Sequence, residues 1–179
     1  DEPRLKPEAK YQGIPACGYA EWMRRMLVGI EVLTGVDYLA SKGDYQAGHV
    51  FYTGPIDEYF GCEHGRLGYR GQLREHKYLR HCQDFQPACQ VNYPRHSDGP
   101  AIRSLEWKKM IPDTEANQSL GTLVTWEIPF TPDDPDQFEY PVPDEVNRER
   151  YGRYRRMAEK VARLTVCGRL GEYRYFDMD

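Results

Sequence analysis

The sequence has no apolar run long enough to cross a membrane, and its first residues do not form a signal-peptide pattern. It has five cysteines, an odd number, and their spacings do not match those of a disulfide-stabilised module. A reducing, cytoplasmic location with free thiols is therefore expected. The net charge of −4 argues against nonspecific nucleic-acid binding, so we expect neither a nucleic-acid nor a membrane partner.

Several motifs that carry chemistry are also missing. There is no G-x-G-x-x-G after a first strand, no P-loop and no G-x-S-x-G turn. The glycines of GRLGYRG, residues 65–71, have a different spacing and fit a strand better than a phosphate cradle. Cys62 and His64 form Cys-x-His, and His81 is adjacent to Cys82, but neither pair has the spacing of zinc ligands. No metal site is expected.

The residues that are present describe a globular chain. Its 179 residues are enough for one domain with a core, and 40% of them are hydrophobic and 29% charged. Fourteen tyrosines are a high count. Such a surplus suits a site that grips a polar ligand, and it equally suits tyrosine-rich antiparallel strands, so composition alone leaves both interpretations open.

The order of elements predicts an α+β fold, an antiparallel sheet of about five or six strands flanked by helices. Helical spacing of apolar residues predicts an amphipathic helix within residues 11–29, and the longest helix, residues 144–164, is capped by Asp144. Residues 30–39 are predicted as a strand and a turn. Strands are also expected within residues 49–60 (before a Gly-Pro turn and a short helix), 65–79, 86–94, 100–110, 121–130 and 165–168.

Arginines and tyrosines are the remaining candidates for a binding site. The arginines that stand beside aromatic residues or glycines, each in a separate segment, are Arg70, Arg103, Arg169 and Arg174. The planar guanidinium binds phosphate through two parallel hydrogen bonds, and Tyr11, Tyr140 and Tyr175 add neutral donors. If these side chains converge, they would bind a diphosphate. Spacing alone equally allows each arginine to form a surface salt bridge.

A series of longer motifs narrows the choice. In order along the chain they are YQGIPACGYAEWM, HVFYTGPIDEYF, GRLGYRGQL, VNYPRHSDGPAIRSLEW, TLVTWEIPF, EYPVPDEVN and GRLGEYRYFDMD. This order resembles the UDP-galactopyranose mutase family over nearly all of residues 11–179. The resemblance implies that residues 11–179 are the C-terminal, substrate-binding part of a three-part flavoenzyme, with residues 1–10 as an exposed lead-in.

That family interconverts UDP-galactopyranose and UDP-galactofuranose with reduced FAD. In the mechanism that the resemblance implies, flavin N5 attacks the anomeric carbon and UDP leaves, and an iminium intermediate lets the sugar ring open and reclose. The protein binds and orients the reactants, and arginine and tyrosine donors around the diphosphate stabilise the departing UDP. The implied ligands are the two UDP-sugars and FAD, and a homodimer is possible within the family.

The resemblance also assigns roles to residues. The expected substrate-binding residues are Tyr11, Asn92, Arg103, Tyr140, Arg169 and Tyr175. The expected FAD-binding residues are Arg70, Gly168, Arg169, Asp177 and Met178, and Arg169 and Asp177 are the expected catalytic residues. Three positions depart from the family pattern. Ala101 and Trp107 replace a tyrosine and a histidine around Arg103, and Glu139 replaces the first tyrosine of a Y-Y-P motif.

The family's N-terminal dinucleotide-binding segment has no counterpart in this sequence. We therefore expect the chain to be a fragment, either an excised domain or one part of a larger polypeptide, whose partner is the missing dinucleotide-binding domain. Alone it should be colourless, inactive and prone to self-association. Two alternatives remain open: a nonenzymatic module that binds nucleotide sugars, and a region of a related flavoprotein of the amine-oxidase type.

Overall fold

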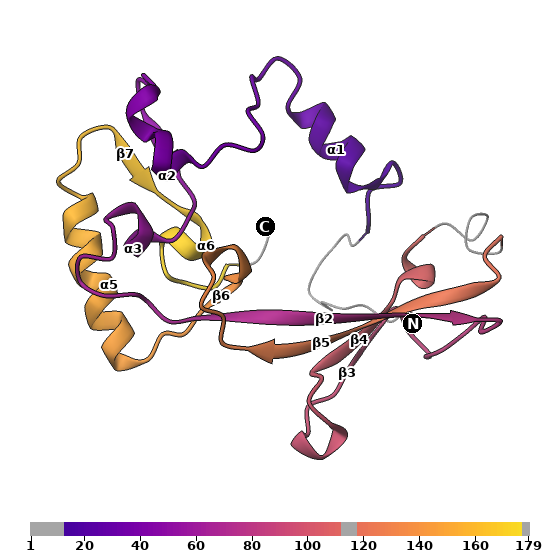
Figure 1. Cartoon of the computed structure of the whole chain (residues 1–179). Coiled ribbons are helices and arrows are strands. Elements are labelled where there is room, and N and C mark those ends of the chain that lie inside the picture. Colours follow the sequence, from indigo (N-terminus) through magenta and orange to yellow (C-terminus); the bar gives the residue numbers. More distant parts are fainter. Residues whose placement is uncertain (1–12, 112–117, 177–179) are drawn as a thin grey trace.

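The computed structural model describes residues 13–111 and 118–176. Its centre is a five-stranded antiparallel sheet in the order β3-β4-β5-β2-β6, built around the long pair β2 (Tyr69–Arg80) and β5 (Gly121–Phe130) (Figure 1). The shorter strands are β3 (Gln90–Asn92), β4 (Arg103–Glu106) and β6 (Tyr140–Pro141). The predicted α+β fold with an antiparallel sheet of five or six strands is confirmed.

The register of this sheet aligns polar residues from four strands. Arg74 of β2 lies opposite Glu127 of β5, and Glu127 lies opposite Arg103 of β4. Arg103 in turn lies opposite Asn92 of β3. Because residues directly opposite one another share a face of the sheet, these four side chains form one row across it.

A second, smaller sheet pairs β1 (Val50–Tyr52) with β7 (Leu164–Val166) in parallel. Parallel neighbours need a crossover, and here the connection includes the whole five-stranded sheet and α5 (Glu145–Ala158). The Asp144 carboxylate accepts a hydrogen bond from Asn147 N at 2.8 Å, which confirms the predicted cap of α5.

The remaining elements are short. The α-helices are α1 (Gly18–Met26), α2 (Tyr38–Ser41), α3 (Ile56–Tyr59) and α6 (Gly168–Gly171). The 3-10 helices are η1 (Lys42–Asp44), η2 (His96–Asp98), η3 (Trp107–Met110) and η4 (Pro135–Gln137). No helix among the described residues is long and apolar enough to span a membrane.

The main core lies where α3, α5, the start of β2 and the segment after α6 meet (Figure 1). Its buried members are Ile56, Leu67, Tyr69, Tyr154, Ala158 and Tyr173. The Tyr69 ring stacks on Phe138 at 4.4 Å between centroids and meets Tyr173 edge-on at 5.3 Å. Part of the tyrosine surplus therefore serves packing, since aromatic rings bury large apolar areas and their hydroxyls still find partners.

Several local predictions need correction. No strand forms within residues 30–39, because Asp37 caps α2 instead, its carboxylate accepting from Leu39 N and Ala40 N. The strand expected at 100–110 stops at Glu106, and η3 follows. The longest helix ends at Ala158, short of the expected residue 164. β6 was not predicted, and it forms through pairing with β2, a long-range contact that leaves no local pattern.

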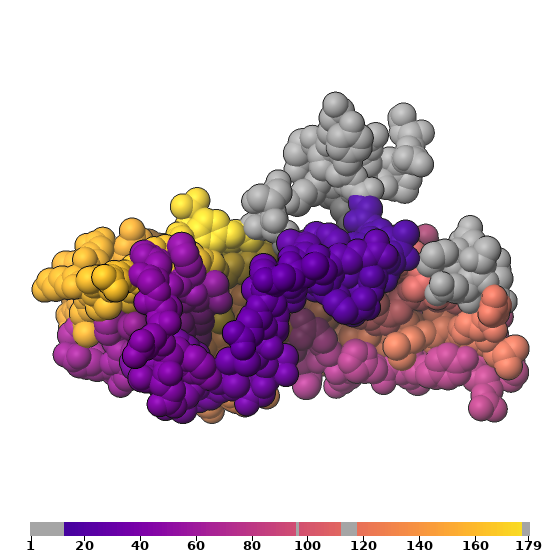
Figure 2. All heavy atoms as spheres, turned by 90° about the horizontal axis from the view of Figure 1, so that it is seen from above, coloured from indigo at the N-terminus to yellow at the C-terminus, as the bar shows by residue number. Residues whose placement is uncertain are grey.

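α1 forms where helical spacing predicted it, but its apolar face is exposed. None of its residues is buried, and Tyr19, Trp22, Met23 and Met26 are all exposed. On the other side of the helix Glu21 forms ion pairs with Arg24 and Arg25. Figure 2 shows this indigo segment running across the face that is viewed. The start of α1 shares a pocket with the apolar side chains of Trp107, Met110 and Ile111.

Candidate functional site

The centre of the candidate site is a buried glutamate held between two arginines. Glu127 is 3% exposed, and each of its carboxylate oxygens accepts from a different strand. Arg74 Nε donates to Oε1 at 3.3 Å, and Arg103 Nε donates to Oε2. At the outer end of the row, Arg74 Nη1 donates to Glu139 Oε1 at 2.8 Å. We call Arg103, Glu127, Arg74 and Glu139 the ion ladder.

The ladder raises the pKa values of its arginines. Burial lowers the pKa of the Arg103 guanidinium, but the hydrogen bond to Glu127 and the neighbouring Tyr140 hydroxyl outweigh it and raise the pKa. For Arg74 the hydrogen bond to Glu139 raises the pKa most, with a further contribution from Glu127. Both guanidiniums stay charged at every physiological pH, so the row is a fixed array of charges.

A second group of side chains adjoins the ladder through Tyr140. The rings of Tyr140 and Tyr175 stack with centroids 5.9 Å apart. The Arg169 guanidinium carbon lies 4.5 Å from the Tyr175 ring centre and 5.5 Å from that of Tyr140, the geometry of cation–π contacts. Arg169 Nε also donates to the main-chain oxygen of Phe176 at 2.7 Å. We call Tyr140, Arg169 and Tyr175 the aromatic clamp.

The ladder and the clamp bring together four of the residues that the sequence singled out. Arg103, Tyr140, Arg169 and Tyr175 come from β4, β6, α6 and the segment after α6. They supply charged forks and phenolic hydroxyls in one place, which is the chemistry that binds phosphate groups. Surface salt bridging, the alternative for each arginine alone, does not describe Arg103, whose partner Glu127 is buried.

The other predicted site residues have different surroundings. Asn92 lies opposite Arg103 in the register, and its side-chain oxygen accepts from Gln90 Nε2 at 3.0 Å. Arg70 lies opposite Tyr140, and its guanidinium donates to Thr131 Oγ1 at 3.3 Å. Tyr11, Asp177 and Met178, like the lead-in 1–10, fall outside the described residues.

Sequence reasoning did not select Glu127, Arg74 or Glu139 as members of the site. Period-two alternation in TWEIPF could have placed Glu127 on one face of β5, but the pairing register that sets it between two arginines is not local. Trp107 was noted as a departure from the family. Its Nε1 donates to Thr125 Oγ1 at 2.6 Å, and Thr125 also bonds His76 Nδ1 at 2.7 Å. The substitution thus creates a hydrogen-bonded row on the same face as the ladder.

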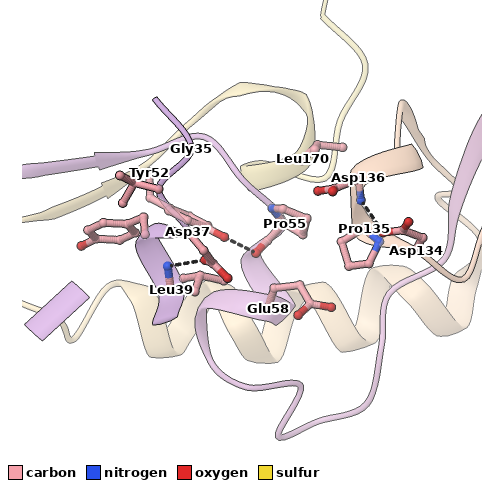
Figure 3. A pocket seen from close by; sticks show the side chains of 12 residues that line it. Gly35, Asp37, Leu39, Tyr52, Pro55, Glu58, Asp134, Pro135, Asp136 and Leu170 are labelled. Carbon is pink, nitrogen blue, oxygen red and sulfur yellow. Dashed lines mark hydrogen bonds between the residues drawn. The ribbon is translucent and has the colours of Figure 1, made fainter. Parts of the chain in front are cut away.

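An acidic pocket of about 730 Å³ lies between α2, the turn after β1 and η4, with Leu170 of α6 in its wall (Figure 3). Its carboxylates are Asp37, Glu58, Asp134 and Asp136. Asp37 caps α2, Asp134 accepts from Asp136 N, and Glu58 pairs with Arg66 at 2.9 Å. A pocket lined by this charge repels an anionic ligand, so we do not consider it for a diphosphate.

One group in the described part of the chain has the composition of metal ligands. The ligand atoms of Asp57, Glu58 and Cys62 lie within 4.8 Å of one another. Asp57 Oδ2, however, accepts from Leu67 N at 2.9 Å, and burial together with Glu58 raises the pKa of the Cys62 thiol to about 11. Among the described residues, neither Cys62 with His64 nor His81 with Cys82 forms such a group.

The carboxyl ends of the two parallel strands bring two glycine-containing turns together. β1 and β7 run side by side and are followed by Thr53–Gly54 and Cys167–Gly168. Ligands of α/β proteins bind outside the carboxyl ends of parallel strands. Gly168 has φ +78°, and an added Cβ there would meet Thr53 no closer than 3.8 Å, so the backbone is open at the end of β7. At the end of β1 the Tyr52 hydroxyl lies 2.5 Å from the position of an added Cβ on Gly54, so the Tyr52 side chain covers that turn.

The fold and the site define a protein built on a curled antiparallel sheet, with clustered arginine and tyrosine donors suited to an anionic ligand. A family model described as UDP-galactopyranose mutase matches residues 8–175, and the chain belongs to this family. The resemblance stated for residues 11–179 is confirmed. The matched region includes all four donors, Arg103, Tyr140, Arg169 and Tyr175.

Individual relatives agree with the family. A probable UDP-galactopyranose mutase of Klebsiella pneumoniae is 30% identical over 95% of this chain and 43% of its own length. The dTDP-fucopyranose mutase of Escherichia coli is 32% identical over 95% of this chain and 46% of its length. The UDP-galactopyranose mutase of Mycoplasma pneumoniae is 30% identical, with 97% and 46% covered. The chain spans less than half the length of these relatives.

Proposed function

We propose that this chain forms the substrate-binding part of a mutase that interconverts the pyranose and furanose forms of a nucleotide sugar, with UDP-galactose as the first candidate. Family membership and the names of the relatives support this reaction class. The observation that carries the proposal is the meeting of Arg103 with the aromatic clamp. Three separate stretches of the chain contribute these donors, and diphosphate recognition needs such convergence.

The proposed role of the ladder and clamp follows from the charge of the ligand. A diphosphate carries negative charge in the ground state and gains more as it leaves the sugar. Fixed donors oriented toward that charge stabilise the departing group without having to reorganise. Arg103 and Arg169 supply the charged forks, while Tyr140 and Tyr175 supply phenolic hydroxyls. Asn92 and Tyr11 are proposed as further substrate-binding residues.

FAD is the proposed cofactor, and its place is the carboxyl edge of β1 and β7. When bound in its reduced form, the flavin would supply the nucleophile for the anomeric carbon. Gly168 and Arg169 begin α6 at this edge, with Asp177 and Met178 further along the chain and Arg70 at the start of β2. Arg169 contributes to the clamp as well, so it would hold the sugar nucleotide against the cofactor.

The rest of the FAD site is proposed to come from a dinucleotide-binding domain of the same polypeptide. The length of the relatives supports this, since each is more than twice as long as the part matched here. We propose that the chain without that domain is inactive. A cytoplasmic location and a homodimer are further proposals for the complete protein.

The first test is calorimetric titration of UDP into two preparations, the chain alone and the chain joined to a dinucleotide-binding half from a relative. Arg103→Ala should weaken UDP binding by about 10- to 100-fold, because it removes charge-assisted hydrogen bonds. Arg153→Ala is the matched control, since the Arg153 guanidinium pairs with Glu149 on the exposed side of α5. Circular dichroism checks that both variants fold.

The same preparations test the reaction. With reduced FAD, the joined protein should convert UDP-galactopyranose to UDP-galactofuranose, as followed by chromatography. Parallel assays with dTDP-fucopyranose address the nucleotide, because the Escherichia coli relative carries that name. Binding without turnover in the joined protein would favour a nonenzymatic nucleotide-sugar module. Equal binding by Arg103→Ala and the parent would contradict the proposed site.

A further inference from the structure

We propose that Glu127 is a positioning residue that holds Arg103 from the side and leaves the end of its guanidinium for the ligand. The inference rests on the proposed function, because it assumes that Arg103 binds a diphosphate. It concerns a residue that does not itself touch the ligand. A negative charge beneath a phosphate-binding arginine would otherwise be unfavourable for binding an anion, so its presence needs a reason.

The atoms that make the contact carry the argument. A guanidinium has five N–H donors, one on Nε and four on the two terminal nitrogens. Glu127 Oε2 accepts from Arg103 Nε, the donor nearest the side-chain stem. This contact holds the guanidinium by Nε rather than by its terminal pair, and so restricts its plane. That pair is the fork which binds phosphate with two parallel hydrogen bonds.

Glu127 is itself held firmly enough to act as a reference point. Its side chain is 4% exposed, and its other oxygen accepts from Arg74 Nε at 3.3 Å. The register places all three side chains in one row on the same face of three adjacent strands. A buried carboxylate with each oxygen occupied by a different strand cannot turn without breaking a charged hydrogen bond.

Arg74 contacts the same carboxylate as Arg103 but differs from it in the partner of its terminal nitrogens. Its Nε also bonds Glu127, but one of its terminal nitrogens, Nη1, bonds Glu139 at 2.8 Å, so a carboxylate of the chain already occupies part of its fork. Arg103 instead has a hydrogen bond with the Tyr140 side chain as its other contact, and Tyr140 belongs to the aromatic clamp. The two arginines flank the same carboxylate, yet only Arg103 extends toward the clamp.

The ladder also balances charge. Two arginines and two glutamates alternate along it, so burying Glu127 is compensated on both sides. If Glu127 were a glutamine, its amide would accept from only one arginine with its single oxygen. Arg103 would then compete with Arg74 for that oxygen, and the amide NH₂ would face the other guanidinium. The expected result is an Arg103 side chain that occupies several orientations.

A double-mutant cycle with UDP as the probe tests the inference. It is run in whichever of the two preparations described above binds UDP. Glu127→Gln should weaken UDP binding by about tenfold or more in the parent, as expected for a misplaced charged hydrogen bond. In the Arg103→Ala background the same substitution should change affinity by less than about twofold, because a residue that acts through Arg103 has nothing left to position.

Glu106→Gln is the matched control. Glu106 lies on β4 and, like Glu127 of β5, is a buried glutamate. It lies on the opposite face of the sheet and accepts hydrogen bonds from Phe85 N and Gln86 N, both at 3.1 Å. We expect it to lower the unfolding midpoint while leaving UDP affinity unchanged. A loss of affinity equal to that of Glu127→Gln would mean that general destabilisation explains both, and the positioning role would be rejected.

A second variant and a ligand-free measurement cover the case in which Glu127→Gln fails to fold. Glu127→Asp keeps the charge but draws the carboxylate back by one methylene, so it should also weaken binding. Nitrogen-15 NMR of the arginine Nε–H groups should show faster hydrogen exchange for Arg103 in this variant than in the parent. Unchanged exchange together with unchanged affinity would overturn the inference. If Arg103→Ala itself leaves UDP affinity unchanged, the proposed diphosphate site fails first and the inference fails with it.

Discussion

Tyr154→Phe should destabilise the fold more than its single lost oxygen suggests. Tyr154 is a fully buried residue of α5, and its side chain packs against the loop after α3. Its hydroxyl accepts from His64 N at 2.8 Å and donates to Gly65 O at 2.8 Å, and so joins the helix to two consecutive residues of that loop. Phenylalanine preserves the ring packing, so the measured change isolates the hydroxyl.

The expected loss of stability follows from the number of hydrogen-bonding groups that lose a partner. Each neutral hydrogen bond contributes about 0.5–1.5 kcal/mol net, and a donor left without a partner adds a further desolvation cost. Losing both bonds of Tyr154 should therefore lower the free energy of unfolding by about 2–3 kcal/mol. For a chain of this size, that corresponds to a fall in Tm of roughly 4–12 °C.

Tyr173→Phe is the comparison that makes this estimate refutable. The Tyr173 hydroxyl lies within hydrogen-bonding distance of Gly68 O and Val142 O, at 2.5 and 2.8 Å, and of Val142 N at 3.2 Å. Val142 N also donates to Gly68 O at 3.0 Å, and Val142 O also accepts from Asp144 N, so these groups keep partners after the change. We expect a loss of only about 1 kcal/mol.

Urea denaturation followed by circular dichroism gives both values from the midpoints and slopes. Tyr154→Phe should have the larger effect by at least about 1 kcal/mol. Equal losses, or a larger loss for Tyr173→Phe, would refute this reasoning, in which removing a hydroxyl destabilises the fold less when the groups bonded to it keep other hydrogen-bond partners.

Two further predictions concern pH and backbone packing. Burial raises the pKa of Asp57, so the folded state binds its proton more tightly than the unfolded state, and stability should fall as pH rises above the ordinary value of 3.8. Asp57→Asn should flatten that dependence in denaturation at pH 4.5 and 7. Gly121→Ala places a Cβ 2.3 Å from Leu79 O and should cost about 1–3 kcal/mol, whereas Gly43→Ala, with nothing within 4 Å, should change thermal stability by under about 0.5 kcal/mol.

Local signals in the sequence predicted the elements that depend on local chemistry. The strand expected at 121–130 is β5, and the strand, Gly-Pro turn and short helix expected at 49–60 are β1 and α3. Asp144 caps its helix as expected because a cap needs only its own carboxylate and the amide three residues on. Within residues 30–39 the alternating pattern predicted a strand, but Asp37 caps the helix α2 instead.

Pairing between distant segments left no such signal. The parallel contact of β1 with β7 and the two-residue β6 exist only because the rest of the chain brings their partners alongside. The ion ladder depends on the same kind of information. Arg103 was selected from the sequence, but a register shift of one residue would move Glu127 to the other face of the sheet and leave Arg103 without its anchor.

The tyrosine surplus shows how the two open interpretations of composition combine. Tyr69, Tyr154 and Tyr173 pack in the core, while Tyr140 and Tyr175 form the aromatic clamp. The groups are connected, because Tyr69 Oη donates to Leu170 O at 3.3 Å, and Leu170 directly follows Arg169. Tyr173 lies two residues before Tyr175. Its hydroxyl donates to Gly68 O, just before β2, and to Val142 O, just after β6. Core tyrosines therefore set where Arg169 and Tyr175 stand relative to Tyr140, and a substitution in the core at Tyr173 should disturb the clamp before it unfolds the chain.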